Sequence, residues 1–189
     1  MKFYANPSDK KWAVLYGTWC GSTRDAAVWI SEGMGRIADV FDARENPDLS
    51  GFDYVVIGGA IRSQQVPPEL QAYIQKNKGM LKEKIRGYFA VCGNMRRPTG
   101  PEQVVSMIDN HLAKLCDVQG VPARAFNGRI TKSLYEPELV ESLKNMPPPP
   151  QNPPPGARPR PSMLEMEDYD MLSRDDCMGF GKTILESTR

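Results

Sequence analysis

The sequence contains a single histidine, His111, among its 189 residues, and this scarcity narrows the chemistry open to the protein. Mechanisms that pair a histidine base with a serine or cysteine nucleophile are therefore disfavoured. The four cysteines form no CxxC pair and have no neighbouring histidine, so their spacing does not predict a zinc or other metal site. It does not reveal a disulfide framework either, and free thiols in a reducing compartment are the simplest interpretation.

The chain also lacks the features of a membrane or nucleic-acid protein. No apolar run approaches the roughly 20 residues needed to span a bilayer. The first residues, MKFYANPSDKKW, lack the apolar centre of a signal peptide. Basic residues number 24 and acidic residues 23, so the basic surplus of a nucleic-acid-binding protein is missing. We expect a cytoplasmic protein with no nucleic-acid partner and no strong membrane signal.

What the sequence does contain is a regular alternation of short apolar runs and amphipathic segments. The runs have the length of buried strands, and the segments between them carry apolar residues at three- and four-residue steps. This alternation predicts an α/β fold with a parallel sheet built from βαβ units. The predicted strands cover residues 12–16, 38–42, 52–59, 87–93 and 121–126.

The alternation ends at a proline-rich segment. Residues 147–161 hold nine prolines in fifteen positions, which neither a helix nor a central strand accepts. We therefore predict one domain over residues 1–189, with an insertion at about 145–162 before a last helix. That helix is predicted to begin after Ser173, an N-cap residue, and to end near Ser187, although Gly179 and Gly181 disfavour it.

The most informative motif is the turn TWCGST, which lies between the first predicted strand and the first predicted helix. Backbone N–H groups at a helix N-terminus attract a phosphate, and hydroxyl side chains add further donors. The turn contains no lysine or arginine, so its predicted donors are neutral. The alternative is an ordinary strand-to-helix turn whose hydroxyls satisfy the helix's own amides. The residues of this turn are Thr18, Trp19, Cys20, Gly21, Ser22 and Thr23.

Thr18, Gly21 and Thr23, in this spacing after a first strand, resemble the phosphate loop of the flavodoxins, which bind FMN through its 5′-phosphate. The chain departs from many flavodoxins in having Cys20 where they carry a third hydroxyl. Residues 54–62, and residues 125–129 followed by Tyr135, more narrowly resemble the flavodoxin-like protoporphyrinogen dehydrogenases. The resemblance implies a flavodoxin-like doubly wound five-stranded parallel sheet, order 2-1-3-4-5, with helices on both faces and FMN as cofactor.

In such a sheet the ligand lies over the carboxyl ends of strands 1, 3 and 4, where the strand order reverses. Neither of the two later loops contains an aromatic residue to stack on the flavin ring, so Trp19 either contacts the flavin or covers the sheet edge. The implied FMN contacts in these later loops are Ala60, Ile61, Arg62, Ser63, Cys92, Gly93, Asn94, Met95 and Arg96.

Three arginines follow the third and fourth strands: Arg62, Arg96 and Arg97. Positive charge near a flavin ring favours its reduced anion, so we predict that the second, anion-forming reduction step has a less negative potential than in a typical flavodoxin. The alternative is that these side chains are solvated and contribute little.

Three functions remain open from the sequence. The resemblance implies an FMN-binding redox protein that transfers electrons to or from a protein partner. The second is a protoporphyrinogen IX dehydrogenase that passes electrons to a quinone, although the polar insertion is poorly suited to a membrane surface. The third is a scaffold without cofactor whose prolines bind a partner groove. No catalytic residue is identified.

Overall fold

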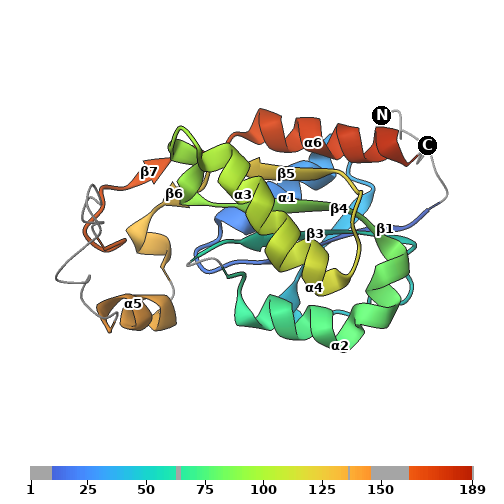
Figure 1. The fold of residues 1–189 in the computed structure, drawn as a ribbon, viewed down its shortest axis with the longest axis horizontal. Coiled ribbons are helices and arrows are strands. Elements are labelled where there is room, and N and C mark those ends of the chain that lie inside the picture. Colours follow the sequence, from blue (N-terminus) through green and yellow to red (C-terminus); the bar gives the residue numbers. More distant parts are fainter. Residues whose placement is uncertain (1–9, 63–64, 136, 146–161, 189) are drawn as a thin grey trace.

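The computed structural model describes residues 10–62, 65–135, 137–145 and 162–188. A five-stranded parallel sheet with the order 2-1-3-4-5 forms its centre (Figure 1). This order confirms the flavodoxin-like fold class expected from the sequence. The strands are β1 (Trp12–Gly17), β2 (Ala38–Asp42), β3 (Tyr54–Ala60), β4 (Ile85–Val91) and β5 (Ala123–Phe126).

Helices connect the strands and cover both faces of the sheet. A π-helical stretch, Asp109–Ala113, joins α3 to α4. Short 3-10 turns cover Ala43–Glu45, Gly93–Arg96 and Lys132–Leu134. The α-helices are α1 (Ser22–Gly33), α2 (Pro68–Lys84), α3 (Gly100–Ile108), α4 (Lys114–Cys116), α5 (Pro137–Lys144) and α6 (Arg174–Ser187). Among the residues described, none of these helices is long and apolar enough to cross a membrane.

The side chains of β1 show how the sheet divides the core into two layers. Successive residues of a strand point to opposite faces. Trp12 and Val14 are buried against α1 and α6, whereas Ala13 and Leu15 are buried against α2 and the α3–α4 helix. Because both faces are covered, the run can be apolar throughout.

Two glycines let α1 and α6 approach closely on one face of the sheet. A Cβ atom on Gly181 would collide with the carbonyl oxygen of Ile30, and one on Gly33 would collide with that of Met178. The helix that Gly181 disfavours by propensity therefore forms because this glycine permits the packing. The predicted N-cap is confirmed, since Ser173 Oγ accepts a hydrogen bond from the Asp176 amide at 3.2 Å.

The sequence did not predict a small second layer at one end of the sheet. Here β6 (Arg129–Ile130) pairs antiparallel with β7 (Tyr169–Asp170), and α5 lies beside them (Figure 1). We call this antiparallel pair the β6–β7 ribbon. A third apolar cluster holds the layer together, with Ile130, Tyr135, Leu139 and Leu143 buried at its centre. The predicted proline-rich insertion lies, apart from its ends, outside the described residues.

The close contact of Gly181 in α6 with α1 makes a testable prediction. Gly181→Ala should lower the free energy of unfolding by about 1–3 kcal/mol, because the added methyl forces α1 and α6 apart. Gly179→Ala is the matched control, since its added Cβ would meet no described atom within 4 Å apart from its chain neighbours and its own helix backbone. It should instead be neutral or stabilising by up to about 1 kcal/mol, through helix propensity. Urea denaturation measures both, and equal effects would contradict this packing.

Candidate functional site

A cavity of about 490 Å³ opens at the carboxyl ends of β1, β3 and β4. The register brings these ends together, since Gly17 lies opposite Gly59 and Ala60 lies opposite Val91. The volume is in the range of small-molecule and cofactor sites. Ten of the residues proposed from the sequence line it: Trp19, Cys20, Ser22, Ala60, Ile61, Arg62, Cys92, Gly93, Asn94 and Arg96.

The other proposed residues have different positions. Thr18 and Thr23 are buried at the strand-to-helix turn. Met95 packs against the main core on the α2 face rather than into the cavity lining. Ser63 lies outside the described residues. Arg97, which the sequence grouped with Arg62 and Arg96, does line the cavity.

The strand-to-helix turn leaves the start of α1 open to an anion. Gly21, the N-cap residue, has φ +84°, a left-handed conformation that glycine adopts readily. Its amide donates to Thr18 Oγ1 at 3.0 Å, which holds the turn closed. Among the residues that the structure describes, no side chain caps α1, so its first N–H groups have no side-chain acceptor from the turn itself. Such an N-terminus attracts negative charge.

The side chain of Thr23 is a second feature of the turn that indicates a ligand-binding site. The side chain is fully buried, and its hydroxyl has no hydrogen-bond partner among the residues described. A buried polar group without a partner costs about 1–3 kcal/mol. An acceptor supplied by a ligand at the N-terminus of α1 would remove that cost.

The structure brings an arginine to this turn that sequence reasoning missed. Arg129, at the start of β6, places Nη2 2.6 Å from Asp25 Oδ2 in the first turn of α1. Its Nη1 lies 3.9 Å from Asp170 Oδ2 on β7. The donors around the turn are therefore not all neutral, contrary to the expectation from the loop alone. Arg129 is distant in sequence, and only the folding of the β6–β7 ribbon brings it there.

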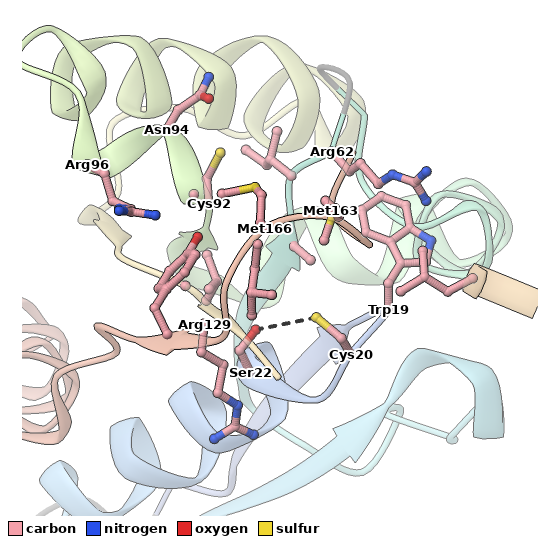
Figure 2. A pocket seen from close by; sticks show the side chains of 18 of the residues that line it. Trp19, Cys20, Ser22, Arg62, Cys92, Asn94, Arg96, Arg129, Met163 and Met166 are labelled. Atoms are coloured by element: carbon pink, nitrogen blue, oxygen red, sulfur yellow. Dashed lines mark hydrogen bonds between the residues drawn. The ribbon is translucent and has the colours of Figure 1, made fainter. Parts of the chain in front are cut away.

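An aromatic residue also reaches the cavity from this ribbon. Tyr169 on β7 lines the cavity, and the Arg96 guanidinium carbon lies 4.2 Å from the centre of its ring. A Cβ on Gly93 would lie 3.1 Å from the Tyr169 hydroxyl, so the loop after β4 packs closely against this ring. Figure 2 shows Trp19 and Cys20 on one side of the cavity and Asn94 and Arg96 on the other. Two aromatic residues thus line a cavity for which the sequence suggested only Trp19.

The remaining wall of the cavity is apolar and comes from the second layer. Ile130, Leu139, Met163 and Met166 line it, and the last two lie over its centre in Figure 2. Behind them Tyr135 is buried with its hydroxyl unpartnered among the described residues. Burial, and secondarily its charged and polar neighbours, raises the pKa of Tyr135 to about 12. The hydroxyl therefore stays protonated at neutral pH.

The two cysteines of the cavity are not equivalent. Cys92 is buried, and this burial raises the pKa of its thiol, which stays protonated near neutral pH. Cys20 is partly exposed in the turn, where its Sγ lies 3.9 Å from Ser22 Oγ.

The fold is an open α/β sheet, and its cavity lies at the point where strand order reverses, which is where such sheets bind their ligands. Residues 13–138 match the sequence pattern of the flavodoxin domain, which covers more than half of the chain. The chain belongs to the flavodoxin-domain family, and FMN is its cofactor. No curated protein sequence matches it.

Solved structures show the same fold at low sequence identity. Oxidised flavodoxin 2 from Bacillus cereus is 12% identical with a TM-score of 0.51, and the match covers 94% of this chain and 99% of the flavodoxin. The Flv1 flavodiiron core from Synechocystis is 12% identical with a TM-score of 0.52, over 93% of this chain and 35% of that core. A flavoprotein in complex with FMN from Lactobacillus acidophilus is 15% identical with a TM-score of 0.46, over 61% of this chain and 93% of that protein.

The residues present fit FMN at its phosphate end. The uncapped start of α1, the unpartnered hydroxyl of Thr23 and the cation of Arg129 together suit a phosphate dianion. The cavity beyond the turn extends between the loops that follow β3 and β4, and it offers room for a planar ring.

The turn makes a prediction about cofactor affinity. The double variant Thr18→Ala and Thr23→Ala should lose several kcal/mol of FMN binding, because each hydrogen bond to a charged group contributes about 1.5–3 kcal/mol. Thr23→Val separates binding of the phosphate from closure of the turn. It removes the unpartnered hydroxyl of Thr23 and keeps the hydrogen bond from the Gly21 amide to Thr18 Oγ1. Quenching of flavin fluorescence on titration measures the affinity.

The control for these variants is Thr183→Ala on the exposed side of α6, where the hydroxyl only donates to the carbonyl of Gly179. It should leave FMN affinity unchanged. Unchanged affinity in the Thr18 and Thr23 double variant would instead refute the role of the turn.

Proposed function

We propose that this protein is an FMN-containing redox protein that transfers electrons to or from a protein partner. The observation that carries the proposal is the cavity at the carboxyl edge of the sheet, with unmet hydrogen-bond donors at its α1 end. The flavodoxin-domain match supports the same function, because FMN supplies one- and two-electron chemistry when bound.

In this proposal each segment of the cavity holds one part of the cofactor. The turn Thr18–Thr23 and the first N–H groups of α1 bind the phosphate. The loops that follow β3 and β4 bind the ring through residues 60–62, 92–94 and 96, which line the cavity. Trp19 and Tyr169, which both line the cavity, are the aromatic residues placed to contact the ring or shield it from water.

A docking surface for the partner lies beside the cavity. Between Ser162 and Asp170, side chains that line the cavity alternate with exposed acidic ones. Glu165 and Glu167 are exposed. Met163 and Met166 line the cavity (Figure 2). Acidic side chains at the rim of a redox site attract a basic partner and raise the rate of encounter. The partner in this proposal therefore presents a basic surface.

The first test is the visible absorption spectrum of the purified protein, followed by anaerobic titration with dithionite. We expect flavin bands in the blue, one FMN released per chain on denaturation, and bleaching of the bands by dithionite. A colourless protein that takes up no added FMN would overturn the proposal and favour a scaffold without cofactor.

The apolar wall favours a second candidate function, the oxidation of protoporphyrinogen IX with electrons passed to a quinone. Ile130, Leu139, Met163 and Met166 give the cavity a surface for a flat, apolar substrate that a simple electron carrier does not require. The polar, proline-rich sequence at about 145–162 counts against it, because it offers little apolar surface to a membrane that holds the quinone.

Anaerobic mixing of the FMN-loaded protein with protoporphyrinogen IX and a water-soluble quinone separates the two functions. Porphyrin fluorescence that rises faster than without protein would favour the dehydrogenase. No acceleration, with a flavin that dithionite still reduces, would favour the electron carrier.

The arginines near the ring predict a shift of potential. Arg96→Gln should make the anion-forming reduction step more negative by about 20–40 mV, the equivalent of about 0.5–1 kcal/mol for a charge near the protein surface. Arg124→Gln is a matched control outside the cavity lining, where Arg124 makes an exposed ion pair with Asp176. Equal potentials in wild type and Arg96→Gln would show that solvent screens this arginine.

A further inference from the structure

We propose that Arg129 is the residue by which this site prefers a phosphorylated flavin to an unphosphorylated one. The inference rests on the proposed binding of FMN and assigns a role to a residue outside the strand-to-helix turn. It follows from where the Arg129 guanidinium lies, from the donors left unpaired around it, and from the charge of Asp25.

The position of Arg129 is determined by two elements. Its backbone belongs to β6, which pairs with β7, and its guanidinium lies against the first turn of α1. The side chain is 14% exposed, and a Cβ on Gly21 would lie 3.7 Å from its Nη2. Figure 2 shows Arg129 extending from the cavity wall toward α1, on the same side as Ser22. The cation is thus held at the end of the cavity where the phosphate is expected.

Two buried donors near the first turn of α1 are unpaired in the described part of the chain. They are the Nε–H of Arg129 and the hydroxyl of Thr23. They come from elements distant in sequence: Thr23 belongs to the first turn of α1, and the guanidinium of Arg129 reaches that turn through its ion pair with Asp25. Leaving a charged donor buried and unpaired is more costly than leaving a neutral one. A phosphate with three acceptor oxygens satisfies both donors, whereas the hydroxyl of an unphosphorylated flavin has one oxygen.

Asp25 gives Arg129 a second role. Its carboxylate lies in the first turn of α1, where it would repel a phosphate that carries a charge of about −1.5 to −2 at neutral pH. Arg129 neutralises this carboxylate at a distance of 2.6 Å. Arg24 also contacts Asp25, at 3.4 Å, but its side chain is 63% exposed and is therefore more strongly screened. Loss of Arg129 should therefore remove a cation that attracts the phosphate, and it should also leave the Asp25 carboxylate without the cation that neutralises it.

A purely structural role for Arg129 makes a different prediction. The ion pair with Asp25 ties the β6–β7 ribbon to α1, the ion pair with Asp170 joins the two strands of the ribbon, and loss of both would disturb the whole cavity. FMN and riboflavin would then weaken together, because they share the ring. A role toward the phosphate weakens FMN alone, so the ratio of the two affinities distinguishes the roles.

The experiment measures Kd for FMN and for riboflavin by fluorescence quenching, with any bound flavin first removed. The variants are Arg129→Gln, Arg129→Lys and the double variant Arg129→Gln with Asp25→Asn. The control is Arg124→Gln, which removes an exposed arginine outside the cavity lining. Thermal unfolding of each variant checks that the fold is retained.

We expect Arg129→Gln to weaken FMN about tenfold or more and riboflavin less than threefold, since one hydrogen bond to a charged group is lost. Arg129→Lys should keep most of the preference, and the double variant should recover part of it because Asp25 no longer repels the phosphate. Arg124→Gln should change neither affinity. A purely structural role of Arg129 would not produce this recovery of the preference for FMN in the double variant.

Two results would overturn the inference. If Arg129→Gln leaves both affinities unchanged, or lowers both by the same factor, Arg129 does not select the phosphate, although FMN still binds. If the wild-type protein binds neither flavin, the proposed function itself fails and this inference fails with it.

Discussion

The candidate site depends on one constraint: the first N–H groups of α1 need acceptors, and the turn before the helix supplies no side-chain cap. In the turn, Thr18 is engaged in holding Gly21 in its left-handed conformation. The buried hydroxyl of Thr23, which has no partner among the residues described, is a further donor that needs an acceptor. In the proposed function a phosphate bound here would satisfy the helix amides and the hydroxyl together, so the fold and the cofactor would stabilise each other.

The β6–β7 ribbon and α5 distinguish this site from the edge of a plain doubly wound sheet. The sheet places the cavity, but the ribbon closes one side of it with Tyr169 and an apolar wall that includes Met163 and Met166. Arg129 and Tyr169 attach the ribbon to α1 and to the loop after β4. In the proposed function the ribbon would therefore determine how much of the bound ring meets water, which bears on both potential and substrate access.

The sequence predicted the parts of the molecule whose signals are local. β1, β3 and β4 are largely apolar, buried runs, and the turn before α1 is a contiguous motif, so these features require no knowledge of distant residues. The ribbon was missed because β6 and β7 have two residues each and meet only across the proline-rich segment. Arg129 and Tyr169 were missed as site residues for the same reason. Gly181 was misread because propensity ignores the neighbouring helix.

The central claim is that a phosphate dianion is held at the start of α1, and ³¹P NMR of the FMN-loaded protein tests it most directly. A free phosphate monoester titrates with a second pKa of about 6. The helix N-terminus and Arg129 stabilise the dianion, so the account predicts one phosphate resonance whose shift stays constant from about pH 5 to 8. A resonance that titrates near pH 6, as in free FMN, would show that the phosphate lies in solvent and would contradict the account.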